Sequence, residues 1–376
     1  MTVQDEMLAP ASEQELSEVI AEAHARRTPI GIFGGGTRIE GRSPEWLTLS
    51  TARLSGVVTY EPGEMTLIVR PGTPVSEIEE MLARENQSLA FEPADLRGVL
   101  GGNGTPTIGG VVAANDSGPR RLRVGACRDH LLGVRFVDGR GRILKNGGRV
   151  MKNVTGLDLG KVMCGSLGTL GVLTEVVLKT LPAARATETL ALPGLSVAQA
   201  VEVFSAALAT PYDIAGAAWR DGTAYLRIEG LDRQVPYRSE KLRAMFRNRE
   251  IDQIDAEGTR ALWRSLRELD HFAGTAAPLW RLMVRPTDAG AITGRLAALG
   301  GAFSLDWGGG LIWYCGPGSG TQVRAALPSG HATLIRRGGA EGLAFTPPPP
   351  VVARLSDQLR RTFDPARILN PGLMDA

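Results

Sequence analysis

The stretch GIFGGGTR at residues 31–38 places three consecutive glycines directly after a short apolar strand, 30–33. Two more glycine-rich stretches follow along the chain, GGNGTPTIGG at 101–110 and GSLGTLGV at 165–172. Because glycine has no Cβ, the backbone N–H groups of such loops are able to converge on an anionic ligand. One such loop is weak evidence, but three in one half of a chain predict a long, phosphate-bearing ligand held at several points.

The common nucleotide-binding motifs do not match these loops. The chain has no G-x-x-x-x-G-K-[ST] segment, which argues against a P-loop. The glycines at 34–36 are not followed by a helix with G-x-G-x-x-G spacing, which disfavours a Rossmann site.

Outward from the loops, the first half of the chain alternates short helical and strand patterns. Ser12 is a plausible N-cap for the first predicted helix. Helices are predicted over 11–27, 75–85 and 157–164, with another starting near 108, and strands over 57–60, 66–70, 131–137, 142–145 and 173–181.

The composition changes after Pro182, where one order of elements occurs twice. Each occurrence reads β-α-β-β-α-β, which predicts two ferredoxin-like units, and a helix around 258–271 joins them. The fold class is therefore α+β. We expect three segments, a first domain over 1–182, a second over 183–345 and a C-terminal segment over 346–376.

Six stretches in a fixed order carry a resemblance to a known family. They are GIFGGGTR at 31–38, RPGTPVSEIEEML at 70–82, PTIGGVVAANDSGPRR at 106–121, RDHLLGVRFVDGRGRIL at 128–144, GGRVMKNVTGLDLGKVMCGSLGTLGVLTEVVLKTLP at 147–182 and RILNPG at 367–372. Together they resemble the vanillyl-alcohol-oxidase/PCMH-type FAD-binding family. GRVMKN followed by GSLGTLGV is similar to its glycolate-oxidising group in particular. The resemblance is weak across 183–345.

The resemblance implies a two-part PCMH-type FAD-binding domain, a cap domain on an antiparallel sheet, and a C-terminal tail that returns to the FAD domain. It also implies which residues bind FAD. The first loop is matched to the pyrophosphate, the second loop and the segment after it to further contacts, and the third loop to the adenine or ribose end. The matching residues are Gly34, Gly35, Gly36, Thr37, Arg38, Thr107, Ile108, Gly109, Gly110, Asn115, Ser117, Gly118, Arg120, Leu167, Gly168, Thr169, Leu170, Gly171, Val172 and Leu173.

Two departures from the family pattern bear on the cofactor. Relatives that tether the flavin covalently carry a His in the first loop or a Cys in the second, whereas this chain has Thr37 and Arg38 in the first and no Cys in 101–110. We therefore expect non-covalent FAD. Many relatives have a Glu where this chain has Leu167, and the loss of that carboxylate lowers the expected affinity.

Candidates for catalysis are few. The chain has four histidines and no H-x-H or H-x-x-x-H pair, so the sequence predicts no metal site. His130 is the best single polar candidate, although a structural hydrogen-bonding role is the more common one for such a residue. Arg281 and Arg285 are candidates for binding a carboxylate. Arg281 belongs to one of three Trp–Arg pairs, at 219–220, 263–264 and 280–281, and each pair is also explained by a Trp that packs in the core beside a solvated arginine.

Composition excludes several functions. A net charge of +2, from 42 Lys+Arg and 40 Asp+Glu, gives no basic excess, and no nucleic-acid partner is expected. Three dispersed cysteines are too few to ligate an iron–sulfur cluster and fit a reducing compartment. Residues 1–22 lack the apolar core of a signal peptide, and no apolar run is long enough to cross a membrane. We expect a cytoplasmic protein that reaches the inner face of the cell membrane through a complex.

The resemblance implies an FAD-binding subunit of an enzyme complex that oxidises glycolate, a small 2-hydroxy acid, to glyoxylate. Its implied partners are a homologous FAD-binding subunit and an iron–sulfur subunit. Because this chain lacks an obvious His base, we expect the homologous subunit to carry the main substrate site. Two alternatives stay open, a self-sufficient FAD-dependent 2-hydroxyacid dehydrogenase and a non-catalytic scaffold.

Overall fold

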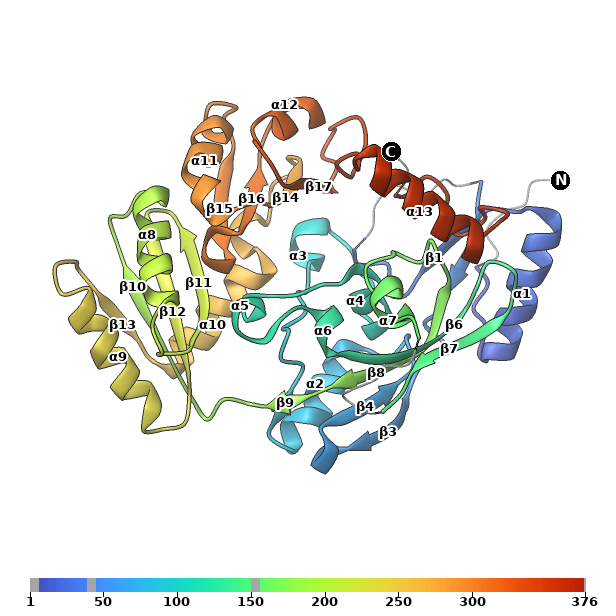
Figure 1. The fold of residues 1–376 in the computed structure, drawn as a ribbon, viewed down its shortest axis with the longest axis horizontal. Helices are drawn as coiled ribbons and strands as arrows, with labels where there is room; N and C mark the ends of the chain where they lie inside the picture. Colours follow the sequence, from blue (N-terminus) through green and yellow to red (C-terminus); the bar gives the residue numbers. More distant parts are fainter. Residues whose placement is uncertain (1–6, 39–44, 150–155, 375–376) are drawn as a thin grey trace.

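The computed structural model describes residues 7–38, 45–149 and 156–374. Figure 1 shows two lobes side by side, a first lobe built from both ends of the chain and a cap built from its middle. The first lobe holds a small two-stranded sheet and a five-stranded sheet, and the cap holds one eight-stranded sheet.

The small sheet pairs β1 (Ile30–Phe33) in parallel with β2 (Leu47–Ser50). The helix α1 (Glu13–Arg26) precedes it, and Ser12 accepts a hydrogen bond from the backbone of Glu15 as its N-cap. The buried side chains of α1, including Leu16 and Ile20, pack with those of β1 and β2 because they recur at helical spacing on one face.

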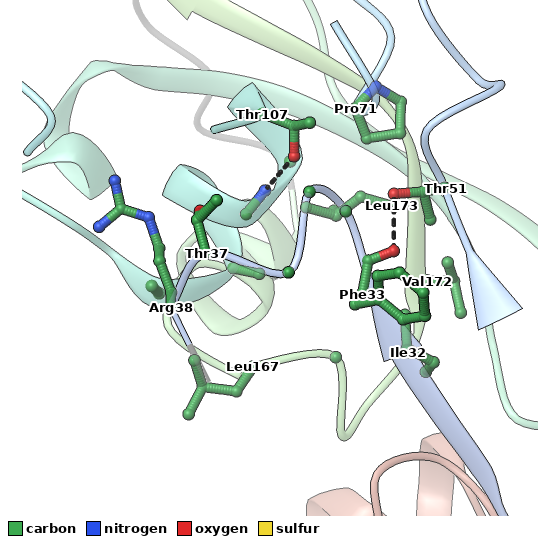
Figure 2. A pocket seen from close by; sticks show the side chains of 18 of the residues that line it. Ile32, Phe33, Thr37, Arg38, Thr51, Pro71, Thr107, Leu167, Val172 and Leu173 are labelled. Atoms are coloured by element: carbon green, nitrogen blue, oxygen red, sulfur yellow. Dashed lines mark hydrogen bonds between the residues drawn. The ribbon is translucent and has the colours of Figure 1, made fainter. Parts of the chain in front are cut away.

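The five-stranded sheet of the first lobe is antiparallel throughout, in the order β3-β4-β8-β6-β7. Its strands are β3 (Val57–Glu61), β4 (Thr66–Val69), β6 (Leu131–Val137), β7 (Ile143–Gly147) and β8 (Val172–Lys179). The helices α2 (Val75–Arg84), α4 (Ile108–Ala114) and α7 (Leu159–Met163) share a core with it. Three glycine-rich loops meet beside α4 and the end of β1 (Figure 2).

Shorter elements complete the first lobe. They are η1 (Pro62–Glu64), β5 (Gln87–Ser88), α3 (Arg97–Leu100), α5 (Arg121–Val124), α6 (Cys127–His130) and β9 (Leu181–Pro182). β5 and β9 pair with each other next to the crossing into the cap.

The cap contains the predicted element order twice. The first unit is β10 (Ala186–Leu192), α8 (Val197–Leu208), β11 (Ile214–Arg220), β12 (Thr223–Gly230), α9 (Gln234–Met245) and β13 (Asp252–Ile254). The second is β14 (Leu279–Met283), α11 (Ala289–Ala297), β15 (Ala302–Asp306), β16 (Leu311–Cys315), α12 (Gly320–Ala325) and β17 (His331–Arg336). The sheet order β13-β10-β12-β11-β15-β16-β14-β17 is the ferredoxin-like order 4-1-3-2 followed by its reverse, so the two units join edge to edge at β11 and β15.

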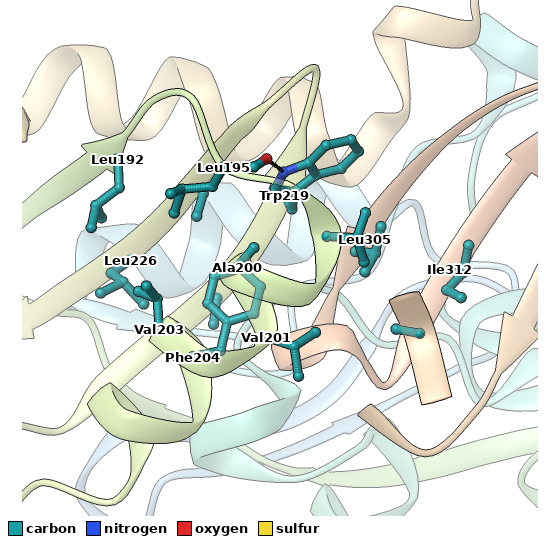
Figure 3. Packing of buried hydrophobic residues seen from close by; sticks show 14 of the residues in the cluster. Leu192, Leu195, Ala200, Val201, Val203, Phe204, Trp219, Leu226, Leu305 and Ile312 are labelled. Atoms are coloured by element: carbon teal, nitrogen blue, oxygen red, sulfur yellow. Dashed lines mark hydrogen bonds between the residues drawn. The ribbon is translucent and has the colours of Figure 1, made fainter. Parts of the chain in front are cut away.

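A single apolar core runs through both units of the cap. Figure 3 shows Phe204 of α8 and Trp219 of β11 in this core, with Leu305 of β15 on the far side of the seam. The buried Trp219 ring stacks on Phe303 and donates its indole N–H to the carbonyl of Leu195 (2.8 Å). The helix α10 (Ala256–Glu268) packs on a separate cluster with Ala218, on the other face of the sheet. Three 3-10 turns, η2 (Asp270–Phe272), η3 (Pro286–Asp288) and η4 (Trp307–Gly309), complete the cap.

The tail returns from the cap to the first lobe through α13 (Pro350–Phe363). Phe363 packs edge-on against Phe136 of β6, and the amide of Ile30 donates to the carbonyl of Ile368 (2.7 Å). No helix in the part of the chain that the structure describes has the length and apolar character to span a bilayer.

The predicted α+β fold class, with its two-part domain and antiparallel cap, is confirmed. Helices and strands agree with the predicted ranges to within a few residues, but β2, β5 and the four-residue helices α3, α5 and α6 were not predicted because they have too few residues to show a period. The predicted domain boundaries fall between β9 and β10 and between β17 and α13, and they stay predictions. In GRVMKN, residues 150–153 lie outside the described residues.

Candidate functional site

The three glycine loops enclose one cavity of about 80 Å³ in the first lobe. Figure 2 shows Thr37, Thr107 and Leu167 on different sides of this space, one from each loop. We call it the glycine cavity. Its lining is Ile32, Phe33, Gly34, Gly35, Gly36, Thr37, Arg38, Thr51, Pro71, Thr107, Gly109, Gly110, Ala113, Ala114, Ser166, Leu167, Gly168, Gly171, Val172 and Leu173.

The glycines of these loops serve two different ends. A Cβ on Gly35 would lie 1.6 Å from the carbonyl oxygen of Thr105, so this glycine lets two loops pack backbone against backbone. By contrast, a Cβ on Gly36 or Gly110 would meet little protein, the nearest atoms being a ring carbon of Phe33 at 4.0 Å and Thr107 Oγ1 at 3.5 Å respectively. Those two line the cavity and keep space free for a ligand.

Most predicted cofactor residues line the glycine cavity, and some do not. The exceptions in the second and third loops are Ile108, Thr169 and Leu170, which are buried instead. Of the segment after the second loop, Asn115 lines a neighbouring cavity, Ser117 accepts from the amide of Cys127 (2.9 Å), and Gly118 accepts from Trp307.

The two arginines among the predicted cofactor-binding residues are held by carboxylates. Arg38 pairs with Asp116 (3.1 Å) and donates to the carbonyl of Ala94. Arg120 pairs with Glu229 of the cap (3.0 Å) and lines a different cavity, between the lobes near β9. In the second loop the amides of Gly109 and Gly110 already donate to Pro71 and Thr107, so a diphosphate in the glycine cavity would rely on the backbone amides of the first loop, 34–37.

Asn370 in the tail links two of the loops, and the prediction from sequence did not assign it a role. Its side-chain oxygen accepts from the amide of Ile32 (2.7 Å), and its side-chain nitrogen donates to the carbonyl of Leu167 (2.8 Å). Leu167 itself adopts a left-handed conformation, φ 52°, which is costly for a residue other than glycine. The motif RILNPG at 367–372 was the available signal.

A second cavity, of about 740 Å³, lies between the first lobe and the cap, and we call it the interlobe cavity. It adjoins the glycine cavity, because Ile32, Arg38, Ala114 and Leu167 line both. Five arginines contribute to its wall, Arg38, Arg121, Arg128, Arg281 and Arg337, together with the carboxylate of Asp116. This excess of positive charge favours an anionic ligand.

Trp307 of the cap holds two of these arginines. The guanidinium of Arg121 lies 4.3 Å from the centre of the Trp307 ring, and that of Arg281 lies 5.4 Å from it. The indole N–H of Trp307 is itself fixed by the carbonyl of Gly118 (3.0 Å). The buried Nε of Arg281 has no hydrogen-bond partner among the described residues, and burial lowers the pKa of this guanidinium. An anion in this cavity would supply the missing partner.

The remaining catalytic candidates lie elsewhere. His130 is buried, and its Nε2 hydrogen-bonds to the carbonyl of Val124 (3.0 Å). Burial lowers the pKa of its imidazole. Among the described residues, it is not part of either cavity wall. Arg285 is exposed between β14 and η3. His331, which was not among the candidates predicted from sequence, lines the interlobe cavity.

The two cavities fit an elongated cofactor such as FAD. The glycine cavity offers backbone amides and side-chain-free space for a diphosphate, and the interlobe cavity has a volume within the usual range for ligand sites. No cysteine lines either cavity within the described residues. In the same part of the chain, no cluster of three or more His, Cys, Asp or Glu side chains is arranged to hold a metal ion.

Comparison with known proteins agrees with this geometry. Residues 5–147 match a family described as an FAD binding domain. The chain is 34% identical over 367 residues to glycolate oxidase subunit GlcE of Escherichia coli (strain K12), covering 96% of this chain and 97% of that protein. It is 31% identical over 189 residues to glycolate oxidase subunit GlcD of Bacillus subtilis (strain 168), covering 50% of this chain and 39% of that one.

A solved alkyldihydroxyacetonephosphate synthase aligns with a TM-score of 0.69 at 17% identity. The alignment covers 97% of this chain and 76% of that one, and at this identity it supports the fold alone. The similarity to GlcE, by contrast, extends over nearly the whole of both chains. The chain therefore belongs to the FAD-binding oxidoreductase family that includes glycolate oxidase subunit GlcE.

Proposed function

We propose that this chain is the GlcE-type, FAD-binding subunit of a complex that oxidises a small 2-hydroxy acid, glycolate, to the 2-oxo acid glyoxylate. The observation that carries the proposal is the junction of the glycine cavity with the arginine-walled interlobe cavity. The similarity to GlcE over nearly the whole of both chains supports the choice of reaction.

The residues present fit FAD as follows. The first glycine loop would hold the diphosphate through backbone amides, with Gly36 and Gly110 leaving room for it. The interlobe cavity, which adjoins the glycine cavity, would receive the flavin ring, and the bound flavin would supply the hydride-accepting chemistry. Arg38 stays paired with Asp116, so it borders both cavities as part of a neutral pair.

We propose that the FAD is bound without a covalent bond. Thr37 stands in the first loop where tethered relatives carry a His, and its hydroxyl is not a nucleophile suited to flavin attachment. The three free cysteines are buried away from both cavity walls of the described structure. Acid precipitation should release all of the flavin into the supernatant, and a yellow pellet would contradict the proposal.

We further propose that the main substrate site lies on a homologous FAD-binding subunit and that an iron–sulfur subunit takes the electrons onward. A general base normally contributes about 10²–10⁴-fold to removal of the hydroxyl proton. Here the one histidine at the interlobe cavity, His331, has an exposed side chain, and His130 is committed to Val124.

A second function, a self-sufficient FAD-dependent 2-hydroxyacid dehydrogenase, is favoured by one observation. Arg281 lines the interlobe cavity, its buried Nε has no hydrogen-bond partner among the described residues, and an arginine fork suits a carboxylate. In that case Arg281 would hold the substrate carboxylate and His331 would take the hydroxyl proton.

Two measurements on the pure chain test the proposal and separate it from its alternatives. An absorption spectrum with the flavin bands is expected, whereas their absence would favour a scaffold without cofactor. Rapid anaerobic mixing with glycolate or D-lactate should bleach the flavin slowly or not at all, and the added partner subunits should restore turnover. Fast bleaching in the lone chain would favour the self-sufficient dehydrogenase.

A further inference from the structure

Four charged side chains, two from each lobe, form a closed ring between the first lobe and the cap. Glu92 and Arg120 belong to the first lobe and Arg227 and Glu229 to β12 of the cap, and we call these four residues the interlobe tetrad. The guanidinium of Arg227 donates to both carboxylate oxygens of Glu92, at 2.8 and 2.7 Å. Glu229 forms ion pairs with Arg227 (3.6 Å) and with Arg120 (3.0 Å). The backbone amide of Arg120 donates to Glu92 (3.0 Å), which closes the ring.

The tetrad is largely buried, and its geometry is fixed. The side chain of Arg227 is 5% exposed and that of Glu92 19%, and the Arg227 guanidinium also lies 4.6 Å from the centre of the Trp263 ring. The backbone of Glu92 adopts a left-handed conformation, φ 49°, which is costly for a residue other than glycine and recurs at functional sites. Desolvation offsets much of the attraction within such buried pairs, so their net contribution to stability is small. The fork of Arg227 instead specifies one orientation of the cap on the first lobe.

The lobes need such a contact because like charges meet across the interlobe cavity. Arg121 of the first lobe and Arg281 of the cap both line this cavity, and they lie 4.3 and 5.4 Å from the centre of the Trp307 ring. Repulsion between the two guanidiniums favours separation of the lobes unless an anion lies between them. Residues 183–185 and 337–349, which connect the lobes, contain no helix or strand that would fix the angle of the cap.

The tetrad is joined to Arg121 through the backbone. Arg120, whose amide is held by Glu92, directly precedes Arg121, and Figure 1 shows the helix α5 that follows at the junction of the two lobes. The carbonyl of Gly118, in the same segment, accepts from the indole N–H of Trp307 (3.0 Å). These two hydrogen bonds together set the place of Arg121 against Trp307. None of the described residues that line the interlobe cavity belongs to the tetrad, so its effect on a ligand there is indirect.

We infer that the interlobe tetrad positions the arginines of the interlobe cavity, holding the lobes so that Arg121 and Arg281 bind one carboxylate between them. The buried Nε of Arg281, which has no hydrogen-bond partner among the described residues, is one of the donors that this carboxylate would meet. Anion binding and closure of the cap are then coupled, and each favours the other by the same factor. The inference rests on the proposed function, because that function identifies the anion as a 2-hydroxy or 2-oxo acid.

The test measures binding of oxalate, an unreactive carboxylate similar in size to glycolate, to the holo chain by isothermal titration calorimetry. Glu92→Gln keeps the shape of the side chain and removes its charge, and it should raise Kd by about tenfold while FAD stays bound. Arg227→Gln should have a larger effect, because it leaves the buried Glu92 without its charged partner. The double variant should bind oxalate more tightly than Arg227→Gln alone, because two side-chain amides are able to hydrogen-bond without charge.

Glu13→Gln is the matched control, because it breaks a partly buried ion pair inside the first lobe, with Arg135 (2.5 Å). It should lower Tm, as Glu92→Gln does, but leave the Kd of oxalate unchanged. A rise in Kd that the control does not share separates positioning of the arginines from a general loss of stability. If Glu92→Gln does not fold, Arg227→Lys takes its place, because it keeps the positive charge, loses the fork and should raise Kd several-fold.

Three results would overturn the inference. They are an unchanged Kd in Glu92→Gln or its substitute Arg227→Lys, an equal rise of Kd in Glu13→Gln, and a wild-type holo chain that does not bind oxalate. Failure of the proposed function is read separately, from missing flavin bands or from fast reduction of the lone chain by glycolate.

Discussion

Replacing Gly110 by leucine should abolish FAD binding while leaving the apoprotein slightly more stable. Gly110 lies in α4 and lines the glycine cavity, and a Cβ there would approach only Thr107 Oγ1, at 3.5 Å. The substitution therefore causes no backbone clash. The rest of the side chain extends into a cavity of about 80 Å³, which then has no room for the diphosphate.

The magnitude follows from two opposing contributions. Leucine is a better helix former than glycine, so the apoprotein gains about 0.5–1 kcal/mol. The holoprotein loses the stabilisation that bound FAD supplies, about 2.7 kcal/mol at a free concentration of 100 Kd. For a lobe of this size, about 2–4 °C per kcal/mol gives a loss of roughly 5–10 °C in the FAD-dependent part of Tm.

Gly294→Leu is the matched control, because Gly294 also lies in a helix, α11, with open space where a Cβ would stand. It should show the helix-propensity gain and keep its flavin. The assay is the ratio of flavin to protein absorbance after gel filtration, together with Tm measured with and without added FAD. Stoichiometric flavin and an unchanged FAD-dependent Tm shift in Gly110→Leu would refute the assignment of this cavity.

Three further predictions concern single side chains. Asn370→Ala should weaken FAD binding and cost about 1–3 kcal/mol, measured by flavin titration and urea unfolding, because the amide of Ile32 and the carbonyl of Leu167 both lose a partner. Burial raises the pKa of Asp306 to about 7, so the folded state binds a proton more tightly than the unfolded state. The free energy of unfolding therefore falls as pH rises from about 4 to 7. Asp306→Asn should remove this pH dependence and be more stable than wild type at pH 8. Burial lowers the pKa of His271 to about 4, so the unfolded state binds a proton more tightly than the folded state. The free energy of unfolding therefore has its full value above about pH 6.5 and decreases as pH falls toward 4. His271→Gln should remove this decrease, measured by urea unfolding at pH 4.5 and 7.5.

Helices and strands with a clear hydrophobic period, separated by recognisable turns, could be predicted from the sequence. The cap units were readable because each helix and strand is long enough to show its period, and turns such as Asp221-Gly222 separate them. The three loops could be singled out as candidate ligand sites because each contains at least three glycines, which let backbone come close to a ligand or to another loop.

Partners distant in sequence could not be predicted. Arg120 was predicted to contact the cofactor, but it forms an ion pair with Glu229 of the cap, more than a hundred residues later. Gly35 was expected to leave space for a ligand, but a Cβ at this position would clash with the backbone of Thr105 in a neighbouring loop. Gly35→Val would therefore disturb the packing of the two loops, whether or not a diphosphate is bound. Which residues Arg120 and Gly35 contact depends on tertiary packing, and a local sequence motif carries no information about that packing.

β1 leaves the ribosome long before the residues that complete it. The amide of Ile32 is satisfied by Asn370, 338 residues later, and the amide of Ile30 by the carbonyl of Ile368. Until synthesis ends, these amides and the carbonyl of Leu167 lack their partners, and the loops that receive the flavin stay unfinished. A chain that stops before residue 368 should therefore hold FAD more weakly than the full chain, because it lacks these three hydrogen bonds.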